Sequence, residues 1–168
     1  MFKHRKFVLI VIGFLFVSII GATASLGIAR ARQEKFIPPA AINFGIWYPV
    51  SGKTEYVLEQ NTLQYDKPTG IITFKLNNKN DNVLTFSQQV VPENFSISPE
   101  AFDQQLAVLQ QVTKFDSVNG TVAITKGSEN GQGTAVLRSK GTLLFAYTKN
   151  PLGVDEWRRI FNDLELVY

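Results

Sequence analysis

Side chains that could carry out chemistry are sparse in this chain of 168 residues. Catalysis without a nearby histidine would rest on paired carboxylates, as in glycosidases. Two candidate pairs lie near the C-terminus, Asp155 with Glu156 and Asp163 with Glu165. The first pair falls in the opening turn of an expected helix, where negative charge complements the helix dipole. We therefore interpret both pairs as solvated surface and expect no enzyme activity.

Residue counts exclude most other catalytic designs. The chain has no cysteine, so disulfides, thiolate catalysis and cysteine-bound metals are excluded. Its single histidine, His4, precedes a long apolar segment. The region after that segment therefore has no Ser-His-Asp triad and no histidine-bound zinc. We predict that the chain has no catalytic residue, no cofactor and no metal site.

A glycine-rich stretch, Gly127 to Gly133, superficially resembles a phosphate-binding loop. Such loops open a helix, whose N-terminus then binds the anion. This stretch instead follows one expected strand and precedes another. We therefore predict a hairpin loop.

Two further groups of residues have both a functional and a structural interpretation. Trp47 and Tyr48 could line a ligand groove, because aromatic residues dominate apolar sites. We favour the alternative that they close the edge of the core just before the first strand. Gln88 and Gln89 interrupt an apolar strand, where a buried glutamine would need partners. Alternation turns one of them outward, and we expect a structural role. The sequence therefore identifies no ligand-binding residue.

Short β-rich runs separated by polar turns predict strands in the first half of the region after residue 41. These runs are Glu55 to Leu58, Leu63 to Tyr65, Ile71 to Leu76 and Val83 to Val91. Tight turns at 67–70 and 77–82 predict antiparallel pairing. Alternation places Ile72, Phe74 and Leu76 on the buried face of their strand.

A helix is expected to begin at Ser98-Pro99, with the serine as its cap. One apolar stripe and one polar face follow it along the sequence. The stripe is Phe102, Leu106, Leu109 and Val112; the polar face is Asp103, Gln104, Gln110 and Gln111. We interpret the glutamine-rich face as solvated surface.

Three more strands and a last helix complete the expected order. The strands are Thr121 to Thr125, Thr134 to Ser139 and Thr142 to Thr148, and the helix is Val154 to Leu164. Four strands, a helix, three strands and a helix predict an α+β domain, an antiparallel sheet with two packed helices.

The N-terminus carries a cationic cluster followed by an uncharged run from Phe7 to Ala29. As a helix the run would reach roughly 34 Å, enough to cross a hydrocarbon core of about 30 Å. A secretory signal cleaved near Ala24 is the alternative, although the run is longer than a signal core. The expected layout is a cytoplasmic tail (1–6), a transmembrane helix or uncleaved signal anchor (7–29), a stalk (30–41) and an extracytoplasmic domain (42–168).

The charge distribution argues against nucleic acid as a partner. Residues 1–35 hold six Lys/Arg and one acidic residue, whereas residues 36–168 hold eleven Lys/Arg and thirteen Asp/Glu. The expected domain is therefore mildly acidic. A nucleic-acid-binding face needs clustered cations, and no such run follows Lys35.

The expected domain resembles the PsbP-like fold of extrinsic photosystem proteins, mycobacterial lipoproteins and uncharacterised membrane-anchored proteins of the bacterial envelope. The resemblance rests on an aromatic entry at 44–49, Phe-Gly-Ile-Trp-Tyr-Pro, and on the strand 142–148 leading into the helix at 154–161. It implies a PsbP-like sandwich without enzymatic activity. We therefore expect a single-pass cell-membrane protein whose domain binds a protein partner in the envelope. The alternative is a carrier or sensor of an apolar or lipid-like ligand, secreted if the N-terminal segment is cleaved.

Overall fold

The computed structural model describes residues 42–49, 55–80, 82–126 and 133–168. The expected cytoplasmic tail (1–6), membrane segment (7–29) and stalk (30–41) all lie outside the described residues. Among the helices that are described, none is long and apolar enough to span a bilayer.

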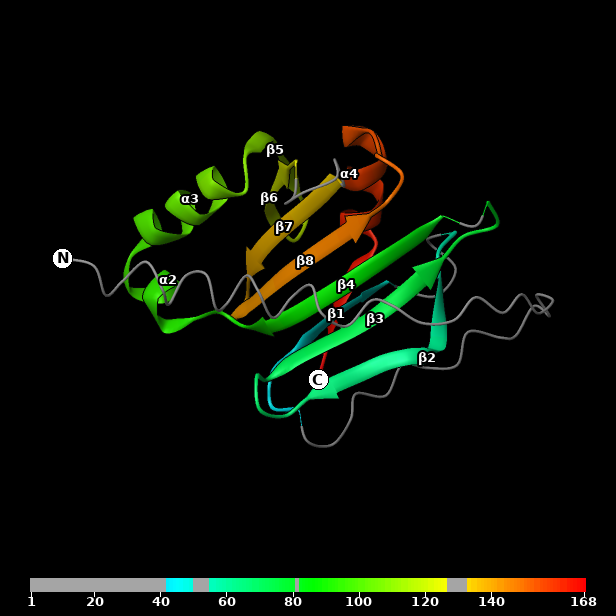
Figure 1. The fold of residues 1–168 in the computed structure, drawn as a ribbon, viewed down its shortest axis with the longest axis horizontal. Coiled ribbons are helices and arrows are strands. Elements are labelled where there is room, and N and C mark those ends of the chain that lie inside the picture. Colours follow the sequence, from blue (N-terminus) through cyan, green and yellow to red (C-terminus); the bar gives the residue numbers. More distant parts are fainter. Residues whose placement is uncertain (1–41, 50–54, 81, 127–132) are drawn as a thin grey trace. The chain divides into compact units, whose positions relative to one another are not determined.

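The described chain forms a mostly antiparallel β domain with three helices, which confirms the expected α+β class (Figure 1). The strands are β1 (Ile46–Pro49), β2 (Val57–Asp66), β3 (Ile71–Asn77), β4 (Val83–Val90), β5 (Gln111–Ser117), β6 (Gly120–Thr125), β7 (Gly133–Ser139), β8 (Thr142–Thr148) and β9 (Leu164–Val167). The helices are α2 (Glu93–Ile97), α3 (Pro99–Val108) and α4 (Val154–Asn162).

Seven of the strands form one antiparallel sheet in the order β2-β3-β4-β8-β7-β6-β5, and β1 pairs with β9 in a separate two-stranded sheet. Two meanders, β2 to β4 and β5 to β8, meet where β4 pairs with β8. Because the second meander begins at the far edge, the chain between β4 and β5 must cross the sheet. Helices α2 and α3 make this crossing.

Each face of the large sheet carries its own core. Alternation directs Phe74 of β3 and Phe86 of β4 to one face, where their rings stack with centroids 5.3 Å apart. This face packs against β1, β9 and α4, including Trp157 and Phe161. On the opposite face a smaller cluster joins α3 to β6, β7 and β8; its buried members are Leu106, Ala123, Val136 and Leu143. The expected inward residues Ile72, Phe74 and Leu76 are all buried.

The expected first helix is too long. We predicted an apolar stripe reaching Leu109 and Val112, but α3 ends at Val108 and Val112 lies in β5, with 60% of its surface exposed. Gln110 adopts φ 55°, a left-handed conformation that ends a helix. The first part of the prediction holds, since Pro99 occupies the first turn and Leu106 is buried. The Ser98 hydroxyl does not cap the helix and instead donates to the Glu100 carboxylate, 2.8 Å away.

Two predicted strands, Glu55 to Leu58 and Leu63 to Tyr65, merge into the single strand β2, which begins only at Val57. A wide irregularity between Glu59 and Gln64 interrupts its pairing with β3. The Thr62 hydroxyl fills this gap, because it accepts from the Lys75 amide (2.8 Å) and donates to the Glu59 carbonyl (2.6 Å).

The last helix is also shorter than predicted. It ends at Asn162, and Leu164 begins strand β9 rather than closing the helix. The buried stripe Trp157, Ile160, Phe161 and Leu164 is nevertheless as expected. Strand β9 pairs with β1, which contains the aromatic pair that we had placed before the first strand.

Candidate functional site

The two carboxylate pairs considered for catalysis do not converge. Asp155 lies in the first turn of α4, and its carboxylate accepts a hydrogen bond from Arg158 at 2.6 Å on an exposed surface. Asp163 follows the end of α4, eight positions after Asp155, which corresponds to roughly 12 Å of helix. Glu165 lies in β9 and is exposed. The pairs thus sit at opposite ends of one helix.

Glu156 has a partner in the core. The Tyr56 hydroxyl donates to its carboxylate at 3.4 Å, and the Tyr56 side chain is almost fully buried. Burial raises the pKa of Tyr56 to about 12, and the negative charges of Glu156 and Glu55 act in the same direction. A phenol with so high a pKa stays protonated and cannot serve as a base at neutral pH. This contact therefore attaches α4 to the chain entering β2.

Trp47 and Gln88 form a structural contact rather than a ligand groove. Trp47 is 0% exposed, and Tyr48 is also buried. The Trp47 amide donates to Gln88 Oε1 at 2.7 Å, and Gln88 Nε2 donates back to the Trp47 carbonyl at 2.7 Å. The Gln88 side chain thus makes the pair of main-chain hydrogen bonds that a neighbouring strand would otherwise make, and it connects β1 to β4. The expected structural role of Gln88 is confirmed, and Gln89 is the half-buried residue on the other face.

The predicted hairpin loop at Gly127 to Gly133 connects β6 to β7 and does not precede a helix. Its residues 127–132 lie outside the described residues. Within the parts that are described, no group of three or more His, Asp or Glu side chains could hold a metal ion.

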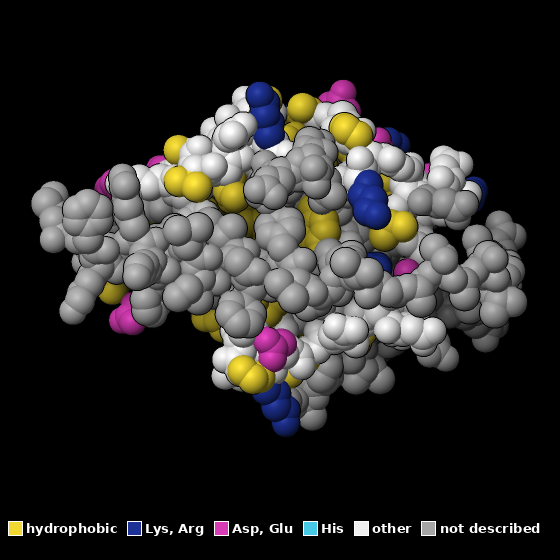
Figure 2. Space-filling model, in the orientation of Figure 1, with side chains coloured by type: hydrophobic (Ala, Val, Ile, Leu, Met, Phe, Trp, Pro, Cys, Tyr) yellow, Lys and Arg dark blue, Asp and Glu magenta, His cyan; other side chains and the backbone are white. Residues whose placement is uncertain are grey.

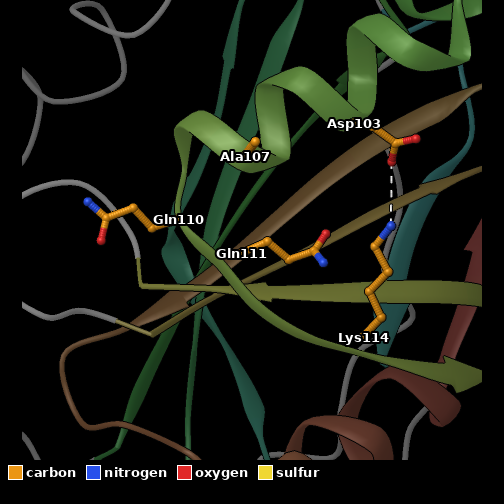
Figure 3. Close-up of a pocket in the computed structure, with 5 residues that line it drawn as sticks. All are labelled: Asp103, Ala107, Gln110, Gln111 and Lys114. Atoms are coloured by element: carbon orange, nitrogen blue, oxygen red, sulfur yellow. Dashed lines mark hydrogen bonds and ion pairs between the residues drawn. The ribbon is translucent and has the colours of Figure 1, made fainter.

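The described surface contains an open hollow of about 520 Å³ between α3 and β5 (Figure 3). Its lining residues are Asp103, Ala107, Gln110, Gln111 and Lys114. Helix α3 contributes the first two, and the turn and strand after it contribute the other three. The left-handed Gln110 creates this corner, because it ends the helix and starts the edge strand within a few residues.

Polar groups line the hollow, and apolar residues are their neighbours in the sequence. Lys114 Nζ lies 3.4 Å from Asp103 Oδ1, with 44% and 67% of the two side chains exposed. A pair this exposed contributes little to stability. Val108 and Val112 lie between the lining residues in the sequence and are both largely exposed, Val108 at 62%. The arrangement offers hydrogen bonds, one charge of each sign and apolar area, which suits binding to a protein surface.

We predicted that Asp103, Gln104, Gln110 and Gln111 form one solvated helical face. Asp103 and Gln104 do lie on α3, but Gln110 lies in the turn after it and Gln111 begins β5. Gln110 carries no signal for a helix end, because glycine or asparagine usually occupies the left-handed position. The stretch Val112-Thr113-Lys114-Phe115 does carry a strand signal in its β-branched and aromatic residues. We assigned Val112 to the apolar stripe of the helix, and the strand was therefore not predicted.

Charged side chains do not gather into one patch on the face seen in Figure 2, where the described Lys and Arg are scattered among uncharged atoms. Comparison of the chain with protein families, with curated proteins and with solved structures finds no match. The functional interpretation therefore depends on the residues and the geometry of this chain.

Proposed function

We propose that this chain is a single-pass envelope protein whose extracytoplasmic domain binds a protein partner and has no chemistry of its own. The observation that supports this proposal most directly is the hollow between α3 and β5, which amide and charged groups line; two exposed valines, Val108 and Val112, lie between its lining residues in the sequence. Exposed apolar side chains beside polar groups are typical of interaction surfaces. The short stalk (30–41) would keep this surface close to an integral membrane partner.

A PsbP-like architecture is part of this proposal. Its support is the order of the elements after residue 42, in which a long antiparallel sheet receives a crossing helix pair and ends in strand β8, helix α4 and an apolar tail. The uncharged run from Phe7 to Ala29 supports a retained anchor. Such a protein would need no cofactor and would not bind nucleic acid.

The carrier alternative requires an apolar cavity between the sheet and a helix. Among the described residues, large side chains fill the space between the sheet and α4: Trp47, Phe74, Phe86, Trp157 and Phe161 are all fully buried. Phe74 stacks on Phe86 with ring centroids 5.3 Å apart, and the ring centroids of Trp157 and Phe161 are 6.1 Å apart. A core packed in this way leaves little room for a lipid-sized ligand. The partner-binding proposal is therefore favoured.

Native mass spectrometry of the full chain, extracted from its own membrane in mild detergent, distinguishes the two functions. We expect the mass of the chain without a lipid-sized addition at unit stoichiometry. The same spectrum shows whether residues 1–24 remain. A stoichiometric lipid-sized addition that survives a second detergent exchange would contradict the proposal and support the carrier.

A further inference from the structure

We propose that the free edge of β5 pairs with β5 of a second copy of this chain, antiparallel and centred on Phe115. Strand β5 is the last strand of the seven-stranded sheet and has β6 as its neighbour. An edge strand presents unpaired main-chain groups that another strand can bind. The resulting sheet would continue from one copy into the other.

The two edges of the sheet differ in their suitability for pairing. At the opposite edge, the irregularity between Glu59 and Gln64 interrupts β2. Such a bulge twists a strand and protects it from edge-to-edge pairing. In β5 the irregularity lies at the start, between Gln111 and Thr113, and pairing with β6 is regular from Thr113 to Ser117. The longer regular stretch at an edge of this sheet is therefore Thr113 to Ser117 of β5, against runs of three residues on either side of the irregularity in β2.

Alternation determines which main-chain groups face outward. A two-residue hairpin turn is closed by a hydrogen-bonded pair, here Ser117 with Gly120. Hydrogen-bonded positions recur at every second residue of an antiparallel strand. The main-chain groups of Phe115, two residues before Ser117, therefore point towards β6, and those of Lys114 and Asp116 point towards the free edge. A two-fold axis at Phe115 brings residues of this second kind together. Lys114 of one copy then exchanges amide hydrogen bonds with Asp116 of the other.

Side chains favour the same register. With the axis at Phe115, Lys114 lies opposite Asp116 of the second copy, and Val112 lies beside Val118, which is 78% exposed. Shifting the axis to Lys114 places two lysines directly opposite each other, and shifting it to Asp116 places two aspartates opposite. Like charges in opposed positions destabilise a strand pair. Of these three registers, the one with the axis at Phe115 therefore opposes unlike charges at its centre and places valines together at its ends.

Cysteine crosslinking tests the pairing directly, because the chain contains no cysteine of its own. The experiment uses full-length chain in mild detergent, carrying either Lys114→Cys or Asp116→Cys, and mild oxidation. Opposed residues in the proposed register have Cα atoms about 5.5 Å apart, within the disulfide range. Identical positions are about 8 Å or more apart, which is too far. We expect a disulfide-linked dimer from the mixture of the two variants and from neither variant alone.

A charge-reversal series provides a matched control. Lys114→Glu or Asp116→Lys alone should weaken the dimer roughly tenfold, because each change opposes like charges twice across the two-fold axis. The double variant restores complementarity and should recover the dimer. A chain that is monomeric at all concentrations, crosslinks from a single variant, or equal crosslinking of all samples would each overturn the pairing.

The dimer does not depend on the proposed envelope partner. The hollow and the pairing edge share one side chain, Lys114, whereas Asp116 belongs to the pairing edge and does not line the hollow. Asp116→Lys is therefore the variant that separates the two: it should weaken the dimer and leave binding of another protein at the hollow unchanged.

Discussion

Single side chains in this domain replace contacts that secondary structure would otherwise supply. Gln88 is the clearest case, because its amide makes two hydrogen bonds of 2.7 Å to the main chain of Trp47. Gln88→Leu keeps the approximate volume but leaves a buried amide and a buried carbonyl without partners. We expect a loss of about 2–4 kcal/mol in the free energy of unfolding. Gln89→Leu, on the other face, should change it by about 0.5 kcal/mol or less.

Tryptophan fluorescence during urea unfolding measures both variants, since Trp47 and Trp157 are the two tryptophans of the chain and both are buried. Equal stability of Gln88→Leu and Gln89→Leu would show that the glutamine contact contributes nothing.

Tyr56 makes the stability of the domain sensitive to alkaline pH. Its pKa is raised to about 12 in the fold, from an unfolded value near 10. The folded state therefore holds a proton that the unfolded state loses first. The stabilisation is fully present below about pH 10 and is lost as the pH rises towards 12. Tyr56→Phe removes this component, so its free energy of unfolding should fall less steeply over that range. Parallel curves for the two proteins would contradict the assignment.

At the scale of elements, the corner between α3 and β5 depends on one residue in an unfavourable conformation. Gln110 has φ 55°, where glycine is the favoured residue. Gln110→Gly should therefore stabilise the domain by about 0.5–1 kcal/mol in the same urea experiment. Ala107→Gly, inside the exposed part of α3, is the matched control and should destabilise it by about 1 kcal/mol. If both glycines destabilise equally, the left-handed conformation carries no cost.

The same corner shows how far the sequence predicts this fold. Periodicity predicted β2 to β4, β6 to β8 and the buried stripe of α4, because alternation and helical spacing are local properties. It did not predict β5, whose first two residues were assigned to the helix. It missed β1 and β9, which are four residues each and gain their pairing only from each other. It also extended the helix through Gln110 to Val112, so the hollow could not be assembled from the sequence. The contact of Gln88 with Trp47 joins residues 41 positions apart and has no local signal.

At the scale of the whole molecule, the described domain combines a filled core with an open polar hollow at one side of the sheet. A packed interior argues for a role at the surface, and the hollow between α3 and β5 is the place where we expect a partner to bind. The opposite edge of the sheet, at β2, has Lys67 in its exposed turn and serves as an internal comparison.

Site-specific photocrosslinking in native membranes tests partner binding most directly. A photoreactive amino acid replaces Gln111, which lines the hollow, or Lys67, at the other edge of the sheet. We predict that position 111 gives a discrete adduct with a different membrane protein and that position 67 does not. An adduct containing only a second 18.8-kDa copy would support self-pairing and contradict the envelope partner. The absence of any adduct at position 111 would also contradict the proposed function. So would identical adducts at positions 111 and 67.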